Sequence, residues 1–499
     1  MDELPGKPAS FWLERSESSA YPSLEESMQV DVAVLGAGIS GVSVALELVE
    51  AGLEVALVEA GRVAGGASGY STAKVSSLHG LTYAKLAAQQ SDEISRAYGQ
   101  ANEAGLASIG ARVDALGIDC DFSRRDNFTY SLEPGEAAEV EQEVEAANRA
   151  GLPASHATEL DLPFDVAAAI RVSNQAQFDP VRYLRGLAAR FAELGGRLFE
   201  HSPAIKVKDA KPCTVRVRGG ATVTADHVVV ATHFPFLDRG LYFARMHPER
   251  SYVIAARARG TLPQAMYLST ESPAHSIRSH PTGEGELLLL GGESHKTGQA
   301  DESERYRRLA SWASASFEIE EFEYRWATQD AIPADGVPMI GRLLPHSERV
   351  LVATGYRKWG YAAGAAAAAI LTDQILGNEN PWAFAFDPGR LRPRASSASF
   401  LKENANVGYR FFADRLKRGS EADLAAGEGR LVGHGLAQHA VSRDADGKLH
   451  RLSARCTHLG CIVAWNDAER TWDCPCHGSR FAADGTVVEG PAVDPLPSR

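Results

Sequence analysis

The fold is decided by the stretch Val30-Asp-Val-Ala-Val-Leu-Gly36-Ala-Gly38-Ile-Ser-Gly41, which the apolar segment 42–51 follows. The run before Gly36 has the nearly continuous apolar composition of a buried parallel strand. The segment after Gly41 is typical of a helix that ends at Gly52. The first glycine of such a turn allows the tight bend, the second lets the backbone approach a pyrophosphate, and the third lets the helix pack on the strand. The helix N-terminus would then face the phosphates, so the stretch predicts a dinucleotide site.

A carboxylate follows at the place where a dinucleotide fold uses one. The next apolar run, 53–58, predicts a second strand, and Glu59 stands at its end. Its carboxylate can accept hydrogen bonds from ribose hydroxyls and would repel a 2′-phosphate, which disfavours NADP. The chain has one such motif, whereas a flavin reductase fed by NADH normally carries two, so we expect one permanently held dinucleotide. The alternative is a glycine-rich turn between a strand and a helix that holds no ligand.

Other segments of the same kind lie far along the chain. The runs 227–231 and 349–353 predict further buried strands, and the second is followed by Gly355 and an Ala-rich helix over about 361–376. Between them, 252–257 and 286–291 predict strands of another sheet. We therefore expect an α/β fold with a Rossmann-like domain whose chain repeatedly leaves to build a mixed-sheet substrate domain.

Length and composition exclude several classes of protein. The chain has 499 residues, more than the roughly 250–300 that one hydrophobic core serves, so two or three domains are expected. Its net charge is −13 and it has no long basic run, which argues against a nucleic-acid partner. The longest charge-free apolar stretch, 359–372, is shorter than the roughly 18 residues of a membrane span. The first residues lack the basic and apolar regions of a secretory signal, so a cytoplasmic location is expected.

A second motif lies near the C-terminus, in Cys456-Thr-His458-Leu-Gly-Cys461 and Cys474-Pro-Cys476-His477-Gly-Ser479. Each loop offers one thiolate and one imidazole, so two thiolates can bind one iron and two imidazoles another. Zinc is the alternative, because two cysteines and two histidines also form a zinc set. Zinc fingers, however, pair the two cysteines and then the two histidines, whereas each loop here carries one of each.

This pattern resembles the Rieske [2Fe–2S] domain over about 420–499. The resemblance implies that the cluster ligands are Cys456, His458, Cys474 and His477. In the respiratory-complex branch of that family, residues placed like Cys461 and Cys476 form a disulfide, and we carry this pairing over. We also expect both histidines to be partly exposed at the tip of the domain. The short apolar runs broken by Asp446-Gly447 and Asp484-Gly485 predict a small all-β fold there.

The larger part of the chain, about 28–380, also resembles a known family. The stretches Val34-Leu-Gly-Ala-Gly-Ile-Ser-Gly41, Asp335-Gly-Val-Pro-Met-Ile-Gly341 and Val352-Ala-Thr-Gly355 are similar to those of the D-amino-acid oxidase, glycine oxidase and sarcosine oxidase group. The resemblance implies extended FAD and hydride removal from a carbon next to an amine nitrogen. Some relatives attach FAD through a histidine, but 66–70 contains neither histidine nor cysteine, so we expect non-covalent FAD. The implied cofactor-binding residues are Gly36, Gly38, Ile39, Ser40, Gly41, Glu59, Ser71, Thr72, Ala231, Thr232, Gly355, Gly360 and Tyr361.

One position departs from this family and bears on the substrate. Relatives that act on free amino acids carry an arginine five residues before the Asp-Gly-x-Pro motif, where it pairs with the substrate carboxylate. Here that residue is Asp330, which can hold a cationic amine, so amines or polyamines are favoured over amino acids. The alternative is that Asp330 faces solvent or a structural arginine.

Four more side chains are catalytic candidates. Tyr356 and Trp359 precede the helix expected to face the flavin and could roof a substrate pocket. His79 and Lys74 follow a loop near the flavin and could move a proton or bond the flavin, or could simply pack the loop.

The chain is thus predicted to comprise four parts. They are a surface lead-in (1–28), an FAD-dependent oxidoreductase (29–378), a connector with a helix from about 400 to 416 (379–419) and the Rieske domain (420–499). Within the oxidoreductase we assign about 29–85, 150–235 and 325–378 to FAD binding, and about 86–149 and 236–324 to the substrate domain.

The predicted activity is oxidation of an amine-type substrate at a C–N bond. Electrons would pass from FAD to the cluster and on to an external acceptor, a protein or a quinone. In one alternative the cluster feeds electrons to FAD for a reduction or an oxygenation. In another the protein is a non-catalytic electron carrier or redox sensor.

Overall fold

The computed structural model describes residues 4–237, 239–416, 424–433 and 438–499. An eight-stranded sheet forms the core of the first domain, in the order β17-β18-β11-β2-β3-β8, with β10 paired to β11 and β9 paired to β10. The central strands are parallel and completely apolar in their inner halves, as expected for a sheet buried on both faces. The strands are β2 (Met28–Leu35), β3 (Val55–Val58), β8 (Arg197–Phe199), β9 (Ala204–Lys208), β10 (Cys213–Val217), β11 (Thr222–Val230), β17 (Met339–Arg342) and β18 (Val350–Thr354).

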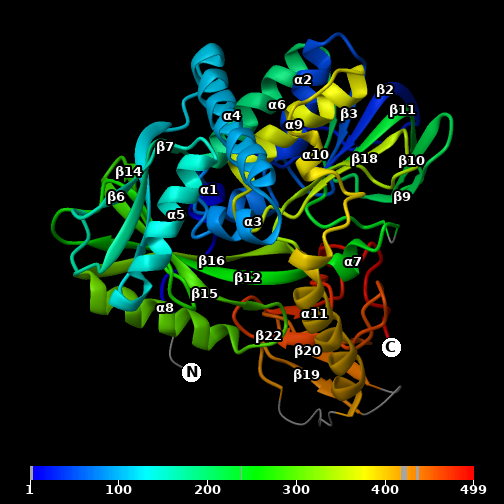
Figure 1. Cartoon of the computed structure of the whole chain (residues 1–499). Coiled ribbons are helices and arrows are strands. Elements are labelled where there is room, and N and C mark those ends of the chain that lie inside the picture. The colour runs from blue at the N-terminus through cyan, green and yellow to red at the C-terminus, as the bar shows by residue number, and fades with distance from the viewer. Residues whose placement is uncertain (1–3, 238, 417–423, 434–437) are drawn as a thin grey trace.

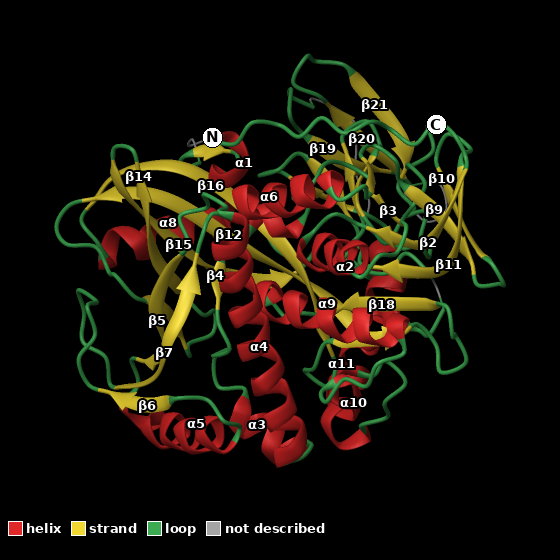
Figure 2. Cartoon of the chain, turned by 90° about the horizontal axis from the view of Figure 1, so that it is seen from above, coloured by secondary structure: helices red, strands yellow, loops and turns green. Residues whose placement is uncertain are grey.

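Helices α2 (Ile39–Glu50), α6 (Pro180–Glu193) and α9 (Gly360–Leu376) pack side by side over this sheet (Figure 1). Helix α4 (Asp92–Leu116) runs beside α9, and Figure 2 shows these helices gathered between the two large sheets of the molecule. The small alanine side chains of α9 let α2 and α4 approach it closely. One layer of helices therefore packs between the two large sheets.

The second domain is built on a ten-stranded sheet in the order β1-β16-β12-β15-β14-β13-β5-β7-β4, with β6 paired to β7. Helix α8 (Glu302–Ser316) covers the face of this sheet that points away from the first domain, while α5 (Ala137–Arg149) packs on β6 and β7 at the other end and α3 (Tyr83–Gln89) packs on α4 and α5. The strands are β1 (Lys7–Pro8), β4 (Lys74–Val75), β5 (Ser123–Ser131), β6 (Ala154–Ala157), β7 (Ala168–Gln177), β12 (Met246–Ala258), β13 (Met266–Ser269), β14 (Ser276–Thr282), β15 (Gly285–Lys296) and β16 (Ile319–Pro333).

Two of the expected boundaries are corrected by the strand pairing. Strands β6 and β7 lie within the segment 150–235 that we assigned to FAD binding, yet β7 pairs with β5 of the second sheet. Strand β16 likewise extends the second domain to Pro333, beyond the expected boundary at 325. The chain therefore returns to the first domain only after β7 and after β16. Which sheet a strand joins is decided by pairing with distant segments, so the local sequence does not reveal it.

The N-terminal segment is also different from the expected surface lead-in. Phe11 and Trp12 in helix α1 (Phe11–Glu14) are 2% and 0% exposed, and Trp12 Nε1 donates a hydrogen bond to the Ser71 carbonyl at 2.8 Å. Strand β1 pairs in parallel with β16. The segment therefore forms part of the core beside the loop that follows β3.

A helical connector leads to the small C-terminal domain. Helix α10 (Ala383–Phe386) precedes α11 (Pro393–Ala413), which begins earlier than the expected 400 because a proline is well suited to the first turn. A three-stranded sheet and a four-stranded sheet follow, as predicted, with turns at Asp446-Gly447 and Asp484-Gly485. Their strands are β19 (Gly429–Val432), β20 (His439–Arg443), β21 (Leu449–Ser453), β22 (Ala464–Asn466), β23 (Thr471–Asp473), β24 (Arg480–Ala482) and β25 (Val487–Glu489).

The predicted α/β class with a mixed-sheet domain and a small β-rich C-terminal domain is confirmed. Figure 1 shows the C-terminal domain, in orange and red, beneath strands β12, β15 and β16, with α11 at its side. Among the described helices, none has the length and apolar character needed to cross a bilayer.

The contact between α4 and α9 gives a test of the packing. A Cβ at Gly105 would lie 2.0 Å from the carbonyl oxygen of Ala362. We expect Gly105→Ala to lower the free energy of unfolding by about 1–3 kcal/mol, the usual range for overpacking, despite the better helix propensity of alanine. Gly408→Ala in α11 is the control, because a Cβ there meets open space and should leave stability equal or higher. Equal thermal unfolding of both variants would contradict this close contact.

Candidate functional site

The glycine turn between β2 and α2 has no room for side chains. Gly36 has φ +98°, and a Cβ there would lie 2.6 Å from the carbonyl oxygen of Ala231 at the end of β11. A Cβ at Gly41 would lie 1.8 Å from the Gly36 carbonyl oxygen. Gly38 is the N-cap of α2, and of the first-turn N–H groups, which lack a partner within the helix, that of Ile39 donates to Ser68 Oγ at 3.2 Å. The turn is thus a backbone cradle suited to phosphate groups.

Glu59 occupies the predicted position at the end of β3. Its carboxylate accepts hydrogen bonds from the backbone N–H groups of Ala37 and Gly61, at 2.6 and 2.7 Å. Burial raises the pKa of Glu59, and the two amide bonds oppose that rise. The carboxylate is therefore anchored next to the glycine turn, where ribose hydroxyls of a dinucleotide would lie.

A single cavity of about 1820 Å³ extends from this turn. That volume exceeds the roughly 300–1,000 Å³ of a pocket for one small ligand, so it accommodates a dinucleotide together with a substrate. The predicted cofactor residues that line it are Gly36, Gly38, Ile39, Ser40, Glu59, Ser71, Thr72, Ala231, Thr232, Gly360 and Tyr361. Gly41 and Gly355 instead support the walls, and a Cβ at Gly355 would lie 2.6 Å from Pro333. These residues fit an extended FAD, with the N-terminus of α9 directed at the cavity.

Asp330 lies on β16 and lines the same cavity. Its carboxylate accepts the backbone N–H of Lys358 at 3.0 Å, and the Lys358 ammonium is paired with Glu249 at 3.3 Å. Burial raises the pKa of Asp330, while His233 and Lys358 act in the opposite direction. Asp330 therefore presents a partly desolvated carboxylate to the cavity.

Tyr356 and Trp359 also line the cavity, as expected for residues that roof it. The Tyr356 hydroxyl lies 2.6 Å from Ser40 Oγ at the start of α2, which ties the roof to the glycine turn. The Trp359 ring stacks on the His79 ring with centroids 4.5 Å apart. Both positions are thus held by the residues that surround the cofactor cradle.

His79 and Lys74 have different surroundings. His79 is buried behind Trp359, with Nδ1 2.5 Å from the Tyr98 hydroxyl and Nε2 2.6 Å from the Ser76 carbonyl. Burial lowers the pKa of His79 to about 3, so its ring is neutral. Both ring nitrogens are engaged in contacts within the protein, which agrees with the alternative that His79 packs the loop. Lys74 lines the cavity, but its amine donates to the Tyr267 carbonyl and burial holds its pKa well below the ordinary value.

The two C-terminal cysteine–histidine loops meet. Cys461 and Cys476 are joined by a disulfide of 2.07 Å, the pairing implied by the resemblance. Hydrogen bonds with the side chains of Cys474 and Ser479 hold the pKa of the Cys456 thiol at about 7. The rings of His458 and His477 have centroids 5.1 Å apart.

The sulfur atoms of Cys461, Cys474 and Cys476 lie within 4.8 Å of one another, but the disulfide uses two of them. The four remaining donors, from Cys456, His458, Cys474 and His477, form the two-thiolate, two-imidazole set of a Rieske cluster. These residues could therefore hold the cluster, and the disulfide links the two loops beside it.

The expected exposure of both histidines is wrong for His477. That side chain is 4% exposed, and His458 is half-buried. Phe243, in helix α7 (Tyr242–Arg245), lies edge-on to both rings, with centroids 5.4 Å from His477 and 6.2 Å from His458. The tip is covered because the C-terminal domain docks on the rest of its own chain.

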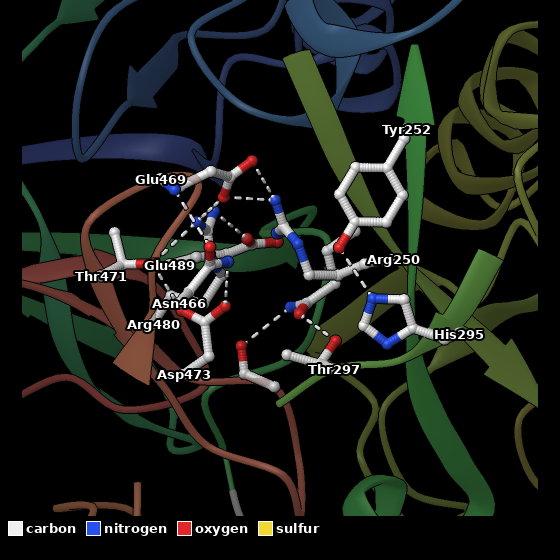
Figure 3. A network of polar contacts seen from close by, with 12 residues as sticks. Arg250, Tyr252, His295, Thr297, Asn466, Glu469, Thr471, Asp473, Arg480 and Glu489 are labelled. Atoms are coloured by element: carbon white, nitrogen blue, oxygen red, sulfur yellow. Dashed lines mark hydrogen bonds and ion pairs between the residues drawn. The ribbon is translucent and has the colours of Figure 1, made fainter. Parts of the chain in front are cut away.

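A buried charge network joins the two parts (Figure 3). Arg250 of β12 is 0% exposed, and its Nη2 lies 2.5 and 2.6 Å from the two carboxylate oxygens of Glu469. Arg480 also bonds Glu469, and it pairs with Asp473 at 3.1 Å and with Glu489 at 3.7 Å. Burial favours the neutral acid, yet Arg480 and Arg250 hold the pKa of Asp473 below its ordinary value. The sequence carries no signal for this network, because nothing local distinguishes its residues from surface charges.

Comparisons with known proteins agree with both halves of this site. Residues 31–374 match the family model "FAD dependent oxidoreductase", and residues 415–499 match "Rieske [2Fe-2S] domain". A "Putative Rieske 2Fe-2S iron-sulfur protein YhfW" of Bacillus subtilis (strain 168) is 35% identical over 98% of this chain and 97% of its own. The "Gamma-glutamylputrescine oxidoreductase" of Escherichia coli (strain K12) is 28% identical over 42% of this chain and 50% of its own. The structure of glycine oxidase from Geobacillus kaustophilus superposes with a TM-score of 0.61 at 19% identity, covering 73% of this chain and 100% of that one.

The close contact at Gly36 predicts that a side chain at this position prevents FAD binding. In Gly36→Ala, the added Cβ would meet the Ala231 carbonyl and would be strained at φ +98°. We expect the purified variant to lose most of its flavin absorbance while its cluster spectrum stays unchanged. Gly135→Ala, where a Cβ meets open space, should keep the flavin of the unaltered chain. A fully flavinated Gly36→Ala protein would show that the cradle does not hold the dinucleotide.

Proposed function

Because the chain belongs to the FAD-dependent oxidoreductase family and carries a Rieske [2Fe–2S] domain, we propose that it is an amine dehydrogenase. It would oxidise an amine-type substrate at a C–N bond and pass the electrons through the cluster to an external acceptor. The observation that carries the proposal is the carboxylate of Asp330 in the cavity wall, at the position where relatives that take free amino acids have an arginine. The similarity to a gamma-glutamylputrescine oxidoreductase supports an amine substrate.

The roles of the residues follow from their contacts. FAD supplies hydride acceptance and a Rieske cluster supplies one-electron transfer. Asp330 would bind the substrate ammonium, and its raised pKa lets it take up the proton that must leave before a hydride can. Tyr356 and Trp359 would bound the substrate, and Trp359 is kept in place by the stacked ring of His79.

The large cavity and the Rieske domain also bear on the alternatives. An electron carrier or redox sensor binds no substrate and requires room for its cofactor alone. The larger cavity therefore favours an enzyme over these alternatives. A cluster on the same chain gives electrons an exit other than oxygen, which favours a dehydrogenase over an oxidase.

An anaerobic screen of the purified holoprotein tests this function. Primary, secondary and polyamines and amino acids are added singly, flavin bleaching is followed optically and the reduced cluster by electron paramagnetic resonance. We expect one of the amines to bleach the flavin, after which the cluster signal grows. If no compound reduces either centre while dithionite reduces both, the amine dehydrogenase proposal fails and electron flow from cluster to flavin becomes the favoured alternative.

Asp330→Asn tests the role of the carboxylate. It should lower kcat/KM for the amine by about 30-fold or more, since losing one partner of a buried charge pair typically costs roughly 2 kcal/mol or more. In the unaltered enzyme, kcat/KM should fall as the pH drops through the Asp330 pKa, which lies above the ordinary 3.8, because protonation removes the negative charge. The variant should lack this acidic limb. Glu318→Gln, at an exposed ion pair with Arg259, is the control, and an unchanged acidic limb in Asp330→Asn would rule out the assigned role.

A further inference from the structure

The docking of the Rieske domain is defined by buried charges. Arg250 is fully enclosed, and a guanidinium left there without its carboxylate would cost several kcal/mol. Glu469 supplies that carboxylate and simultaneously bonds Arg480. The domain therefore docks at one defined position on the ten-stranded sheet, because shifting it would separate Arg250 from Glu469 while both remain covered.

The loop that carries Cys474 and His477 also contacts the substrate domain at this docking position. Gln299, just after β15, donates its side-chain N–H to the Pro475 carbonyl at 3.1 Å. A Cβ at Gly298 would lie 3.1 Å from the Asp473 carbonyl, and one at Gly478 would lie 2.6 Å from Pro248. The loop that carries Cys474 and His477 is thus in direct backbone contact with strands of the substrate domain.

One side chain connects this loop to the cavity wall. Gln329 Nε2 donates to the Gly478 carbonyl at 2.8 Å, and Gln329 Oε1 accepts from the Thr297 hydroxyl at 2.6 Å. Gly478 directly follows His477, and Gln329 directly precedes Asp330. Asp330 and Gln329 both line the cavity, and the Gln329 amide also reaches the cluster loop. Strand β16 therefore lies between Asp330 and the cluster loop, and Gln329 connects the cavity wall to that loop.

We infer that electrons reach the cluster within a single chain, across β16 at the contact between Gln329 and Gly478, with Gln329 as the positioning residue. This inference rests on the proposed function and deepens it by naming the route. Oxidation of the amine to an imine releases two electrons and two protons. The electrons leave the flavin one at a time through the cluster to a one-electron acceptor, which is reduced twice, or to a quinone, and the protons pass to water or to that quinone.

The first experiment asks whether one chain suffices. The flavin of the holoprotein is reduced by a light flash with a deazaflavin and EDTA, so that no amine is needed, and cluster reduction is followed in time. We expect a rate constant that does not depend on protein concentration. A rate constant that rises in proportion to concentration would overturn the inference.

Transfer between subunits of an oligomer is tested by co-expressing two variants. Gly36→Ala should lack flavin and Cys456→Ser should lack the cluster, so a mixed oligomer holds each centre on a different chain. We expect no cluster reduction after the flash, although dithionite still reduces the cluster. Fast cluster reduction in this pair would show transfer between chains and overturn the inference.

Gln329→Leu tests the contact, because it keeps a side chain of similar size and removes both hydrogen bonds. It should slow cluster reduction roughly tenfold, the effect of losing a hydrogen bond at the upper end of its usual contribution. The cluster potential and its paramagnetic signal should stay unchanged, which a loss of folding would not allow. The matched control is Gln264→Leu, whose amide bonds Leu262 and Glu286 of the substrate domain.

Transfer at the unaltered rate in Gln329→Leu would place the crossing elsewhere and overturn the role of this residue. Because the flash supplies the electrons, the flash experiments do not depend on finding a substrate. A failed amine screen would therefore reject the proposed function and leave the electron route to be decided by the flash experiments. Conversely, a successful screen with slow, concentration-dependent cluster reduction would keep the function and reject the route.

Discussion

The alternation of side chains along β16 governs both halves of the molecule. Trp326 and Asp330 share one face of the strand, and Gln329 on the other face bonds the Rieske domain, while all three line the cavity. The pairing with β12 fixes this arrangement, placing Arg250 opposite Gln329 and Glu249 opposite Asp330. A slip of one residue would exchange the two faces, so the Asp330 carboxylate would meet the cluster loop in place of the Gln329 amide.

Burial of charge gives this arrangement its specificity. Arg250 of β12 is paired with Glu469 across the contact between the sheet and the Rieske domain, and within that domain Asp473 accepts hydrogen bonds from Asn466 and Thr471 at 2.9 and 2.8 Å. Glu469 bonds both arginines, so a displaced domain would leave the buried Arg250 guanidinium without its carboxylate. Apolar packing alone would bury comparable surface but would tolerate sliding. The charges therefore determine which loop faces β16.

Local spacing explains why much of the site was predictable from the sequence. The glycine turn, Glu59 and the two cysteine–histidine loops are short-range patterns whose geometry follows from a few bonds. The pairing of Arg250 with Glu469 joins residues 219 apart, and neither has a neighbour that marks it. The same limit applies to β7, which joined the second sheet, and to Trp12, whose burial depends on Ser71. His477 looked like an exposed ligand because Phe243, which covers it, comes from another domain.

The Rieske domain forms part of the cavity wall as well as holding the cluster loops. Its turn between β22 and β23 contributes Asp467, Glu469 and Arg470 to the cavity wall, and the Ser303 hydroxyl at the start of α8 bonds Asp467 at 2.6 Å. A wall in this place limits the access of water to the cavity. A charge such as that of Asp330 interacts more strongly with a cationic ligand in a drier site, because less solvent screens it. Removing the domain would therefore alter the proposed amine binding as well as the proposed electron transfer, because both parts of the chain line one cavity.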